Sequence, residues 1–212
     1  QSEYAGGAIA AVNSNIIVST GTFSQNLVNL NNGGGAINAE YGSLILNDCT
    51  FKQNQATLAG GAIYAEKLDL NTTNCNFTNN RNSINNGGGA IALNYGVWSD
   101  LNGSYSNNYS ASSGGALDIA DSNVTIQKSY FVENRSDYNG GAIYHSGGNL
   151  SSFDNSFIRN YASQGGGVYC NQSTSLIFGN NRFIANEANA SVWSTGSALY
   201  MNEVNSQVQI TN

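Results

Sequence analysis

The chain has 212 residues, of which seven are Lys or Arg and 13 are Asp or Glu, so its formal net charge is −6. Nucleic-acid-binding proteins carry basic stripes or patches, and the acidic balance therefore argues against a nucleic-acid partner. No apolar run approaches the roughly 20 residues of a membrane span, so we expect no membrane insertion by this chain. Because no signal peptide precedes Gln1, the sequence is interpreted as a mature or excerpted chain.

Proline is absent, Gly occurs 25 times and Asn 35 times. A missing proline is typical of a backbone in which nearly every N–H donates to a neighbouring strand. Excess Gly and Asn suit tight corners, because both residues tolerate the left-handed conformation. The composition therefore favours a fold of short strands joined by many tight corners.

Two short signatures recur in the same order along the whole sequence. In the first, a glycine pair leads to a small residue and then an aliphatic one; in the second, an aromatic residue stands three places before an Asn. The small residue precedes the aromatic by 15 positions in the first six copies and by 16 in the seventh, so this interval is structural. The small residues, which we use to begin coils 1 to 8, are Ala8, Ala36, Ala62, Ala90, Ala116, Ala142, Gly167 and Ala198. The aromatic and Asn pairs are Phe23/Asn26, Phe51/Asn54, Phe77/Asn80, Tyr105/Asn108, Phe131/Asn134, Phe157/Asn160 and Phe183/Asn186.

Aligning the copies on the small residue shows an alternating pattern. The next residue is always aliphatic, the third is mostly apolar, and the one between them is mixed, which indicates a strand. A second inward-facing strand follows, and a third ends on the aromatic. The first column is Ile9, Ile37, Ile63, Ile91, Leu117, Ile143, Val168 and Leu199, and the other apolar column is Ala11, Ala39, Ala65, Leu93, Ile119, His145, Cys170 and Met201. The second strand places Ile16/Val18, Leu44/Leu46, Leu70/Thr72, Val124/Ile126 and Leu176/Phe178 inward.

Coils of 25 to 31 residues are too short to own a core and must bury their apolar faces against one another. The sequence therefore predicts one all-β domain over residues 1–212. Its fold is a single-stranded parallel β-helix, or β-solenoid, with about seven full coils and a partial eighth.

The two signatures together resemble a known repeat. GGA[I/L/V], as in Gly60-Gly61-Ala62-Ile63, paired with FxxN, as in Phe77-Thr78-Asn79-Asn80, is similar to the repeat of the chlamydial polymorphic membrane proteins and related surface adhesins. The resemblance covers nearly all of the chain and implies a right-handed parallel β-helix displayed outside the cell as an adhesin or passenger. Coil 4 departs from the pattern, with Tyr105 in place of Phe and an irregular second strand at 96–101.

The constant offset of each Asn from its aromatic predicts a ladder of corner amides that bond the turn and its neighbours. This ladder comprises Asn26, Asn54, Asn80, Asn108, Asn134, Asn160 and Asn186. Cys49 and Cys75 share another inward column, and stacked strands about 4.8 Å apart allow a disulfide. Two buried thiols are the other interpretation, because Gly21, Gly103 and Ser129 occupy the same column elsewhere.

Few residues suggest catalysis or metal binding. His145, the only histidine, falls in an inward column next to Cys170, where we expect a core histidine bonded to a backbone group. A His/Cys metal pair is the alternative, but two ligands fall short of the usual three or four. Glu40 and Glu66 share a column predicted to face outward, without a converging base. We therefore expect no cofactor, no metal and no enzyme activity.

The column between the two apolar ones is predicted to face outward and ends in three stacked tyrosines. It reads Ala10, Asn38, Tyr64, Ala92, Asp118, Tyr144, Tyr169 and Tyr200. The ladder of Tyr144, Tyr169 and Tyr200 is a candidate face for glycans or a partner surface, since Tyr offers area and a hydroxyl at small entropic cost. Cross-rung stacking that merely protects the sheet explains the same pattern.

Sequons for N-glycosylation are numerous but little above chance for this composition. Two of the nine fall on the predicted internal ladder, Asn108 and Asn134, and are expected to stay bare. The candidate glycosylation sites are Asn71, Asn76, Asn102, Asn123, Asn149, Asn171 and Asn189.

Taken together, the sequence predicts a non-catalytic structural or adhesive element that is extracellular or at the cell surface, as a stalk or filament subunit. The expected partners are copies of the chain stacked end to end or neighbouring domains of a longer chain, and glycans or a host surface. The alternative is a carbohydrate-active enzyme, similar to a polysaccharide lyase, on the same scaffold.

Overall fold

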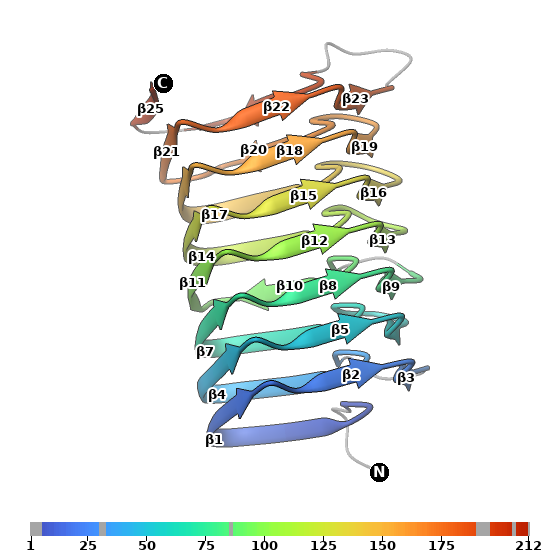
Figure 1. Cartoon of the computed structure of the whole chain (residues 1–212). Coiled ribbons are helices and arrows are strands. Elements are labelled where there is room, and N and C mark those ends of the chain that lie inside the picture. The colour runs from blue at the N-terminus through green and yellow to red at the C-terminus, as the bar shows by residue number, and fades with distance from the viewer. Residues whose placement is uncertain (1–5, 30–32, 85–86, 190–195, 205–206, 212) are drawn as a thin grey trace.

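The computed structural model describes residues 6–29, 33–84, 87–189, 196–204 and 207–211, and all their regular structure is β-strand. The strands stack in parallel as a β-solenoid of about seven turns, which confirms the predicted fold class. Figure 1 shows each turn lying on the previous one, with β1 at one end of the stack and β25 at the other. Among the described residues no helix is long and apolar enough to cross a membrane.

The largest sheet contains 11 strands and is formed by the first part of every coil. Five coils contribute one long strand each: β1 (Ile9–Ser19), β4 (Ile37–Asn47), β7 (Ile63–Thr73), β14 (Leu117–Gln127) and β17 (Ile143–Phe153). Three coils contribute two shorter strands each: β10 (Ile91–Asn94) and β11 (Val97–Leu101), β20 (Val168–Asn171) and β21 (Ser175–Gly179), and β24 (Leu199–Asn202) and β25 (Val208–Thr211).

Two further sheets of seven short strands complete the coils. One carries the aromatic residues: β2 (Thr22–Ser24), β5 (Thr50–Lys52), β8 (Asn76–Thr78), β12 (Ser104–Ser106), β15 (Tyr130–Val132), β18 (Ser156–Ile158) and β22 (Arg182–Ile184). In the other sheet each strand begins one residue after the Asn of the aromatic-x-x-Asn signature: β3 (Leu27–Val28), β6 (Gln55–Ala56), β9 (Arg81–Asn82), β13 (Tyr109–Ser110), β16 (Arg135–Ser136), β19 (Tyr161–Ala162) and β23 (Glu187–Ala188).

The predicted division of each coil into three strands is only partly right. In five coils the first two strands are one strand of 11 residues, bent at a residue with positive φ such as Tyr41 (55°), Lys67 (52°) or Asp121 (47°). One residue in the left-handed region turns the chain without breaking the ladder. The two-residue strands after each Asn were not predicted, because they are too short to show a periodic pattern.

From coil 2 to coil 7 the inward columns form the core as predicted, whereas in the end coils Ile9 and Leu199 are half-buried and Met201 is 39% exposed. Ile37 pairs with Ile63, which pairs with Ile91, and all three side chains have 0% exposed surface. The aromatic column forms a continuous stack from Phe23 to Phe183, with ring centroids 4.7–5.0 Å apart and planes within 10° of parallel. Each such contact adds about 0.5–1.5 kcal/mol beyond the burial of its area.

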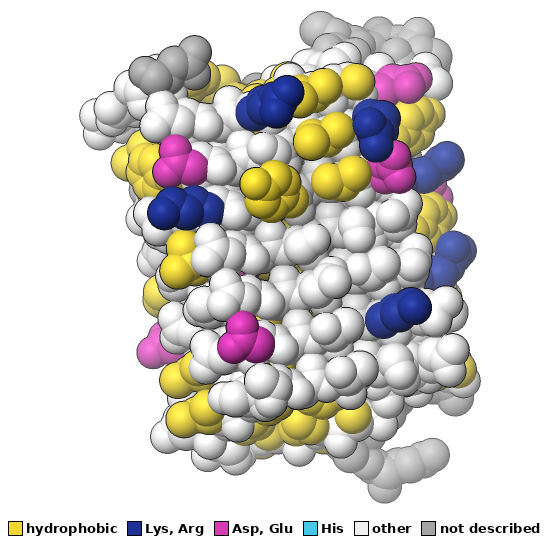
Figure 2. Space-filling view, in the orientation of Figure 1, with side chains coloured by type: hydrophobic (Ala, Val, Ile, Leu, Met, Phe, Trp, Pro, Cys, Tyr) yellow, Lys and Arg dark blue, Asp and Glu magenta, His cyan; other side chains and the backbone are white. Residues whose placement is uncertain are grey.

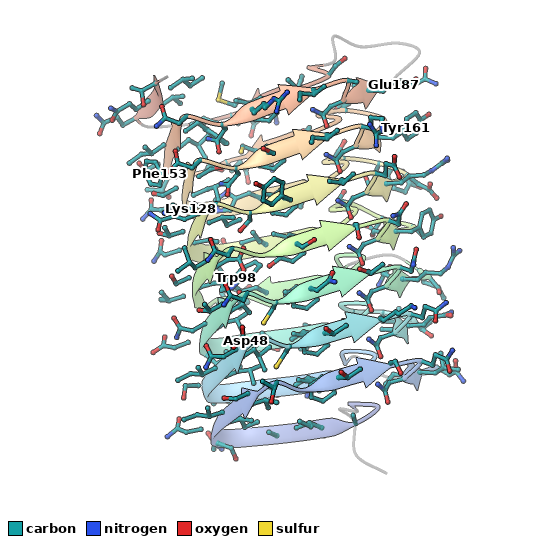
Figure 3. All side chains as sticks on the ribbon, in the orientation of Figure 1. Asp48, Trp98, Lys128, Phe153, Tyr161 and Glu187 are labelled. Atoms are coloured by element: carbon teal, nitrogen blue, oxygen red, sulfur yellow. The ribbon has the colours of Figure 1, made fainter. Side chains whose placement is uncertain are left out.

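Coil 4 keeps the register that its sequence appeared to break. Trp98 lies opposite Leu70 and Asp100 opposite Thr72, so both side chains point into the core, and Trp98 is labelled in Figure 3. The hydroxyls of Thr72, Tyr105 and Ser129 all donate to the buried Asp100 carboxylate. Tyr105 therefore replaces Phe because its hydroxyl is needed here, 3.0 Å from Asp100.

Candidate functional site

The outer face of the first strands is more enclosed than the sequence predicts. Asn38 is 0%, Ala92 4% and Tyr169 7% exposed, although their column was expected to face open solvent. The glycine pairs explain this, because the chain folds back here against the outer face of the strand: a Cβ on Gly60 would collide with the main chain of Ile63. Only glycine permits so close an approach of two backbone segments.

A cleft of about 470 Å³ opens on this face, with lining residues from coils 2 to 6. It is lined by Leu58, Tyr64, Gly87, Ala92, Asn94, Tyr95, Asp118, Ala120, Tyr144 and Ser146. The register places Ala92 between Tyr64 on β7 and Asp118 on β14, and Tyr144 on β17 directly after Asp118. The cleft therefore exists because a methyl group stands where the neighbouring coils carry larger side chains.

Tyr64 is fixed in place by the groups beside it. Its hydroxyl donates to Glu66 Oε2 at 2.7 Å and accepts from Asn94 Nδ2 at 3.3 Å. Glu66 also forms an ion pair with Lys67, 2.9 Å between Oε1 and Nζ. The hydrogen bond from Lys67, aided by that from Tyr64, lowers the pKa of Glu66, whereas burial chiefly raises the pKa of Tyr64. One wall of the cleft is thus a pre-positioned aromatic ring.

Asp118 lies on the opposite side of Ala92 without a basic partner in the cleft lining. Burial raises the pKa of its carboxyl to about 7, and the main chain of Gly87 opposes this only in part. Desolvation likewise raises the pKa of Tyr144, and the nearby Asp118 charge raises it further. The second wall therefore combines a carboxyl group that titrates near neutrality with another aromatic ring.

The predicted tyrosine ladder continues from this wall. Tyr144, Tyr169 and Tyr200 are cross-strand neighbours, and their ring centroids are separated by 5.6 Å and 5.0 Å. Tyr144 and Tyr200 are half-buried and Tyr169 is buried, so the ladder is a partly sheltered surface rather than an open one.

The predicted asparagine positions form a ladder along the whole stack. In each step the side-chain oxygen accepts from the backbone N–H and the amide of the Asn one coil earlier, as Asn134 Oδ1 does from Asn108 at 3.0 Å in both bonds. The same Asn134 amide donates to Tyr105 O and to Asn160 Oδ1. The seven members are Asn26, Asn54, Asn80, Asn108, Asn134, Asn160 and Asn186.

Cys49 and Cys75 are free buried thiols, not the disulfide that the sequence left open. Each donates to a carbonyl of the preceding coil, Cys49 to Val18 and Cys75 to Leu46. Burial raises the pKa of Cys75 to about 12, so this thiol stays protonated at neutral pH. Further along the same column Asn155 and Asn181 form a second, shorter amide ladder, which was not predicted.

Two polar residues differ in part from what the sequence predicts. His145 is buried as predicted, and its Nδ1 lies 2.8 Å from the Ser173 hydroxyl. Burial lowers the pKa of His145, and main-chain contacts from Ser122 and Asn149 oppose this, so backbone groups also act on the ring. Glu40 lies on the outer face, in the column of Glu66, but it is 6% exposed rather than open to solvent and accepts from Asn38 Nδ2 at 3.0 Å. The tightly folded glycine turns cover this part of the outer face.

The sequons fall into buried and exposed groups. Asn108 and Asn134 are buried in the ladder, and Asn171 is half-buried. The exposed ones are Asn71, Asn76, Asn102, Asn123, Asn149 and Asn189.

Sequence reasoning did not single out Tyr64 and Asp118 as a site. Their column was recognised, but the hollow depends on Ala92 between them and on the loops that carry Leu58 and Gly87. A small residue between two large ones in an outward column was the available signal.

The family model of the Chlamydia polymorphic membrane protein (Chlamydia_PMP) repeat matches the chain at residues 48–66 and 128–146. Both segments contain an FxxN motif and the following GGA motif, so the resemblance inferred from these motifs is confirmed. Neither the curated proteins nor the solved structures contain a significant match to the chain.

Proposed function

We propose that this chain, which carries repeats of the polymorphic membrane protein family, is a non-catalytic adhesive element displayed at a cell surface. The solenoid serves as a rigid stalk, and the cleft between Tyr64 and Tyr144 with the adjoining tyrosine ladder is its contact site. The repeats and the solenoid support the surface role. The observation that carries the adhesive role is the cleft, since concave sites with aromatic walls and few polar groups are typical of ligand binding.

The charge distribution supports a single contact site. Figure 2 shows that the face formed by the sheet from β2 to β22 carries only isolated charged side chains and has hydrophobic side chains grouped in its upper part. Along the edge formed by β9 to β23, basic groups stack on aromatic ones, as Arg135 does on Tyr161 at 4.9 Å, and Figure 3 shows Tyr161 and Glu187 on that edge. Surface pairs of this kind contribute little and define no pocket.

We further propose that the ends of the solenoid stack on copies of the chain or on neighbouring domains of a longer chain. Within the described residues β1 pairs only with β4, and β25 only with β21. Ile17 and Ile210 on these strands are 69% and 61% exposed. A parallel strand with apolar side chains and a free edge is a template for further pairing.

The proposed adhesion is tested by binding the purified chain to cultured host cells and to immobilised glycans. We expect the double substitution Tyr144→Ala and Tyr169→Ala to abolish binding that the native chain shows. Tyr130→Ala is the matched control, because Tyr130 is 57% exposed on another sheet. Equal binding by all three proteins, or no binding by the native chain, would contradict the proposal.

Asp118 supports a second candidate, a carbohydrate-active enzyme. A carboxyl group with a pKa of about 7 in a cleft has the property of a general acid. Among the described residues, however, no three His, Cys, Asp or Glu side chains are placed to share a metal ion. Turnover of polyuronates or neutral glycans that disappears in Asp118→Asn would favour the enzyme over the adhesin.

A further inference from the structure

The hollow in the cleft has dimensions set by the rung spacing. Tyr64 and Asp118 are two rungs apart, with Ala92 between them. At about 4.8 Å per rung their backbones are separated by roughly 10 Å. The Tyr64 side chain and the Asp118 carboxyl group thus border the same gap, which one compact group can fill.

The gap is negatively charged and lacks a compensating cation. The lining contains Asp118 but no Lys, Arg or His. On β7, Glu66 is paired with Lys67, β10 contributes no charged residue, and on β17 only Tyr144 faces Asp118. Asp118 is contacted by the main chain of Gly87, but the described lining gives it no basic partner. A partly buried carboxylate in this situation favours a cationic ligand, because the ligand restores the electrostatic stabilisation that desolvation removed.

We propose that this cleft binds a quaternary ammonium group of the choline type, with the cation between the Tyr64 ring and the Asp118 and Tyr144 wall. This inference rests on the proposed adhesive function, because it names the ligand class of the same site. Aromatic faces attract cations through the ring quadrupole, and quaternary ammonium recognition is the main use of such sites. A primary ammonium needs three hydrogen-bond acceptors, whereas a quaternary one needs only a shaped apolar and anionic surface.

The cation interacts favourably only with the ionised carboxylate. Burial raises the pKa of Asp118 to about 7, and bound cation must lower it. The Asp118 carboxyl is mostly protonated at pH 5.5 and mostly ionised at pH 8.5, so the dissociation constant should rise at least severalfold as the pH is lowered between these values. The other titratable groups beside the cleft are Tyr64, Tyr95, Tyr144, Glu66 and Lys67. The pKa of Glu66 is lowered and the pKa values of Tyr64, Tyr144 and Lys67 are raised, so these four groups keep their protonation state in this range.

The test is titration of the 212-residue chain with choline at pH 8.5, followed by NMR shifts of the backbone amides. We expect saturable shifts at the cleft residues, and at least tenfold weaker binding of 3,3-dimethyl-1-butanol, the uncharged analogue of the same shape. Asp118→Asn should weaken choline binding at least tenfold, whereas Asp154→Asn, an exposed site on another edge, should leave it unchanged. Both substitutions keep the side-chain shape, and the amide spectrum verifies the fold.

The inference would be overturned by equal binding of choline and its uncharged analogue or by no effect of Asp118→Asn. Tighter binding of Nα-acetyl-lysine amide, whose side chain carries a primary ammonium, than of choline would also overturn it. The proposed function fails separately. Cell binding that depends on Tyr144 and Tyr169 without choline binding would remove only the ligand assignment, and choline binding without cell binding would remove only the adhesive role.

Discussion

The two faces of the first strand in each coil differ in how much they vary along the stack. The inward column stays aliphatic in every coil, as in Ile37, Ile63 and Ile91. The outward column on the same backbone changes from Asn38 to Tyr64 to Ala92. Inward side chains must fit two neighbours at a fixed rung spacing, whereas outward ones meet that demand only where a turn covers them. The constant face therefore specifies the fold, and the variable face holds the cleft.

On the inner face, a residue that departs from the repeat pattern is accompanied by other departures that satisfy its hydrogen bonds. Asp100 is accompanied by hydroxyl groups at Thr72, Tyr105 and Ser129, one coil before, within and after its own. A buried carboxylate left without such donors would cost several kcal/mol. On the outer face, by contrast, one unmatched small residue, Ala92, leaves a hollow that the loops of Leu58 and Gly87 border.

The largest expected effect comes from truncating the constant face. Ile63→Ala should lower the free energy of unfolding by about 2–5 kcal/mol, because its neighbours in the stack cannot collapse into the cavity. Asn71→Ala on the same strand β7 is the control, since Asn71 is exposed and should change stability by less than about 0.5 kcal/mol. Urea denaturation measures both. Equal midpoints for Ile63→Ala and the native chain would contradict the assignment of the core.

A smaller loss is expected when coil 4 is returned to the repeat pattern. Tyr105→Phe restores the usual aromatic but removes one donor to Asp100, so stability should fall by about 1.5–3 kcal/mol, as for hydrogen bonds to charged groups. Phe131→Tyr in the next coil places a hydroxyl in the same core stack without this carboxylate and should not stabilise. If Tyr105→Phe unfolded at the same or a higher urea concentration, the matched-set interpretation would be wrong.

Asp118 on the outer face should make the free energy of unfolding depend on pH. Burial raises the folded-state pKa of Asp118 to about 7, above its ordinary value, so its stabilising contribution is complete in acid and is lost as the pH rises to about 7. Burial lowers the pKa of His145 to about 4, so its contribution is lost as the pH falls through the same range. The two slopes oppose each other in the native chain.

The difference in the free energy of unfolding between the native chain and Asp118→Asn isolates the pH dependence that is due to Asp118. The native chain should gain stability relative to the variant as the pH is lowered from 7.5 to 5, since His145 is common to both proteins. Denaturation in urea at several pH values gives this difference directly. Parallel curves would show that Asp118 is not buried enough to be perturbed.

The difference between the two faces also explains which features could be predicted from the sequence. The fold class, the core columns and the asparagine positions were predictable because a residue stacked on its own equivalents repeats with a fixed offset. The cleft was not, because it depends on loops of variable length such as those of Leu58 and Gly87. The partners of His145 and Glu40 were also missed, since Ser173 and Asn38 reach them through side-chain geometry that no repeat specifies.

The smallest expected change in stability comes from N-glycosylation, which should modify exposed asparagines on the outside of the solenoid and not those in the buried ladder. If the chain is expressed in a host that glycosylates Asn, we expect sugars at one or more of the outer sequons and none at Asn108 or Asn134. Asn134 uses its amide nitrogen for two hydrogen bonds inside the wall, whereas the Asn123 side chain is exposed and only its oxygen accepts a bond, from Asn149 N at 3.2 Å. Glycopeptide mass spectrometry tests this at Asn71, Asn76, Asn102, Asn123, Asn149, Asn171 and Asn189. Surface sugars should shift the free energy of unfolding by less than about 0.5 kcal/mol, as other surface changes do. A sugar on Asn134 requires an open ladder, and it would show that the inner face is not the constant, closed structure described above.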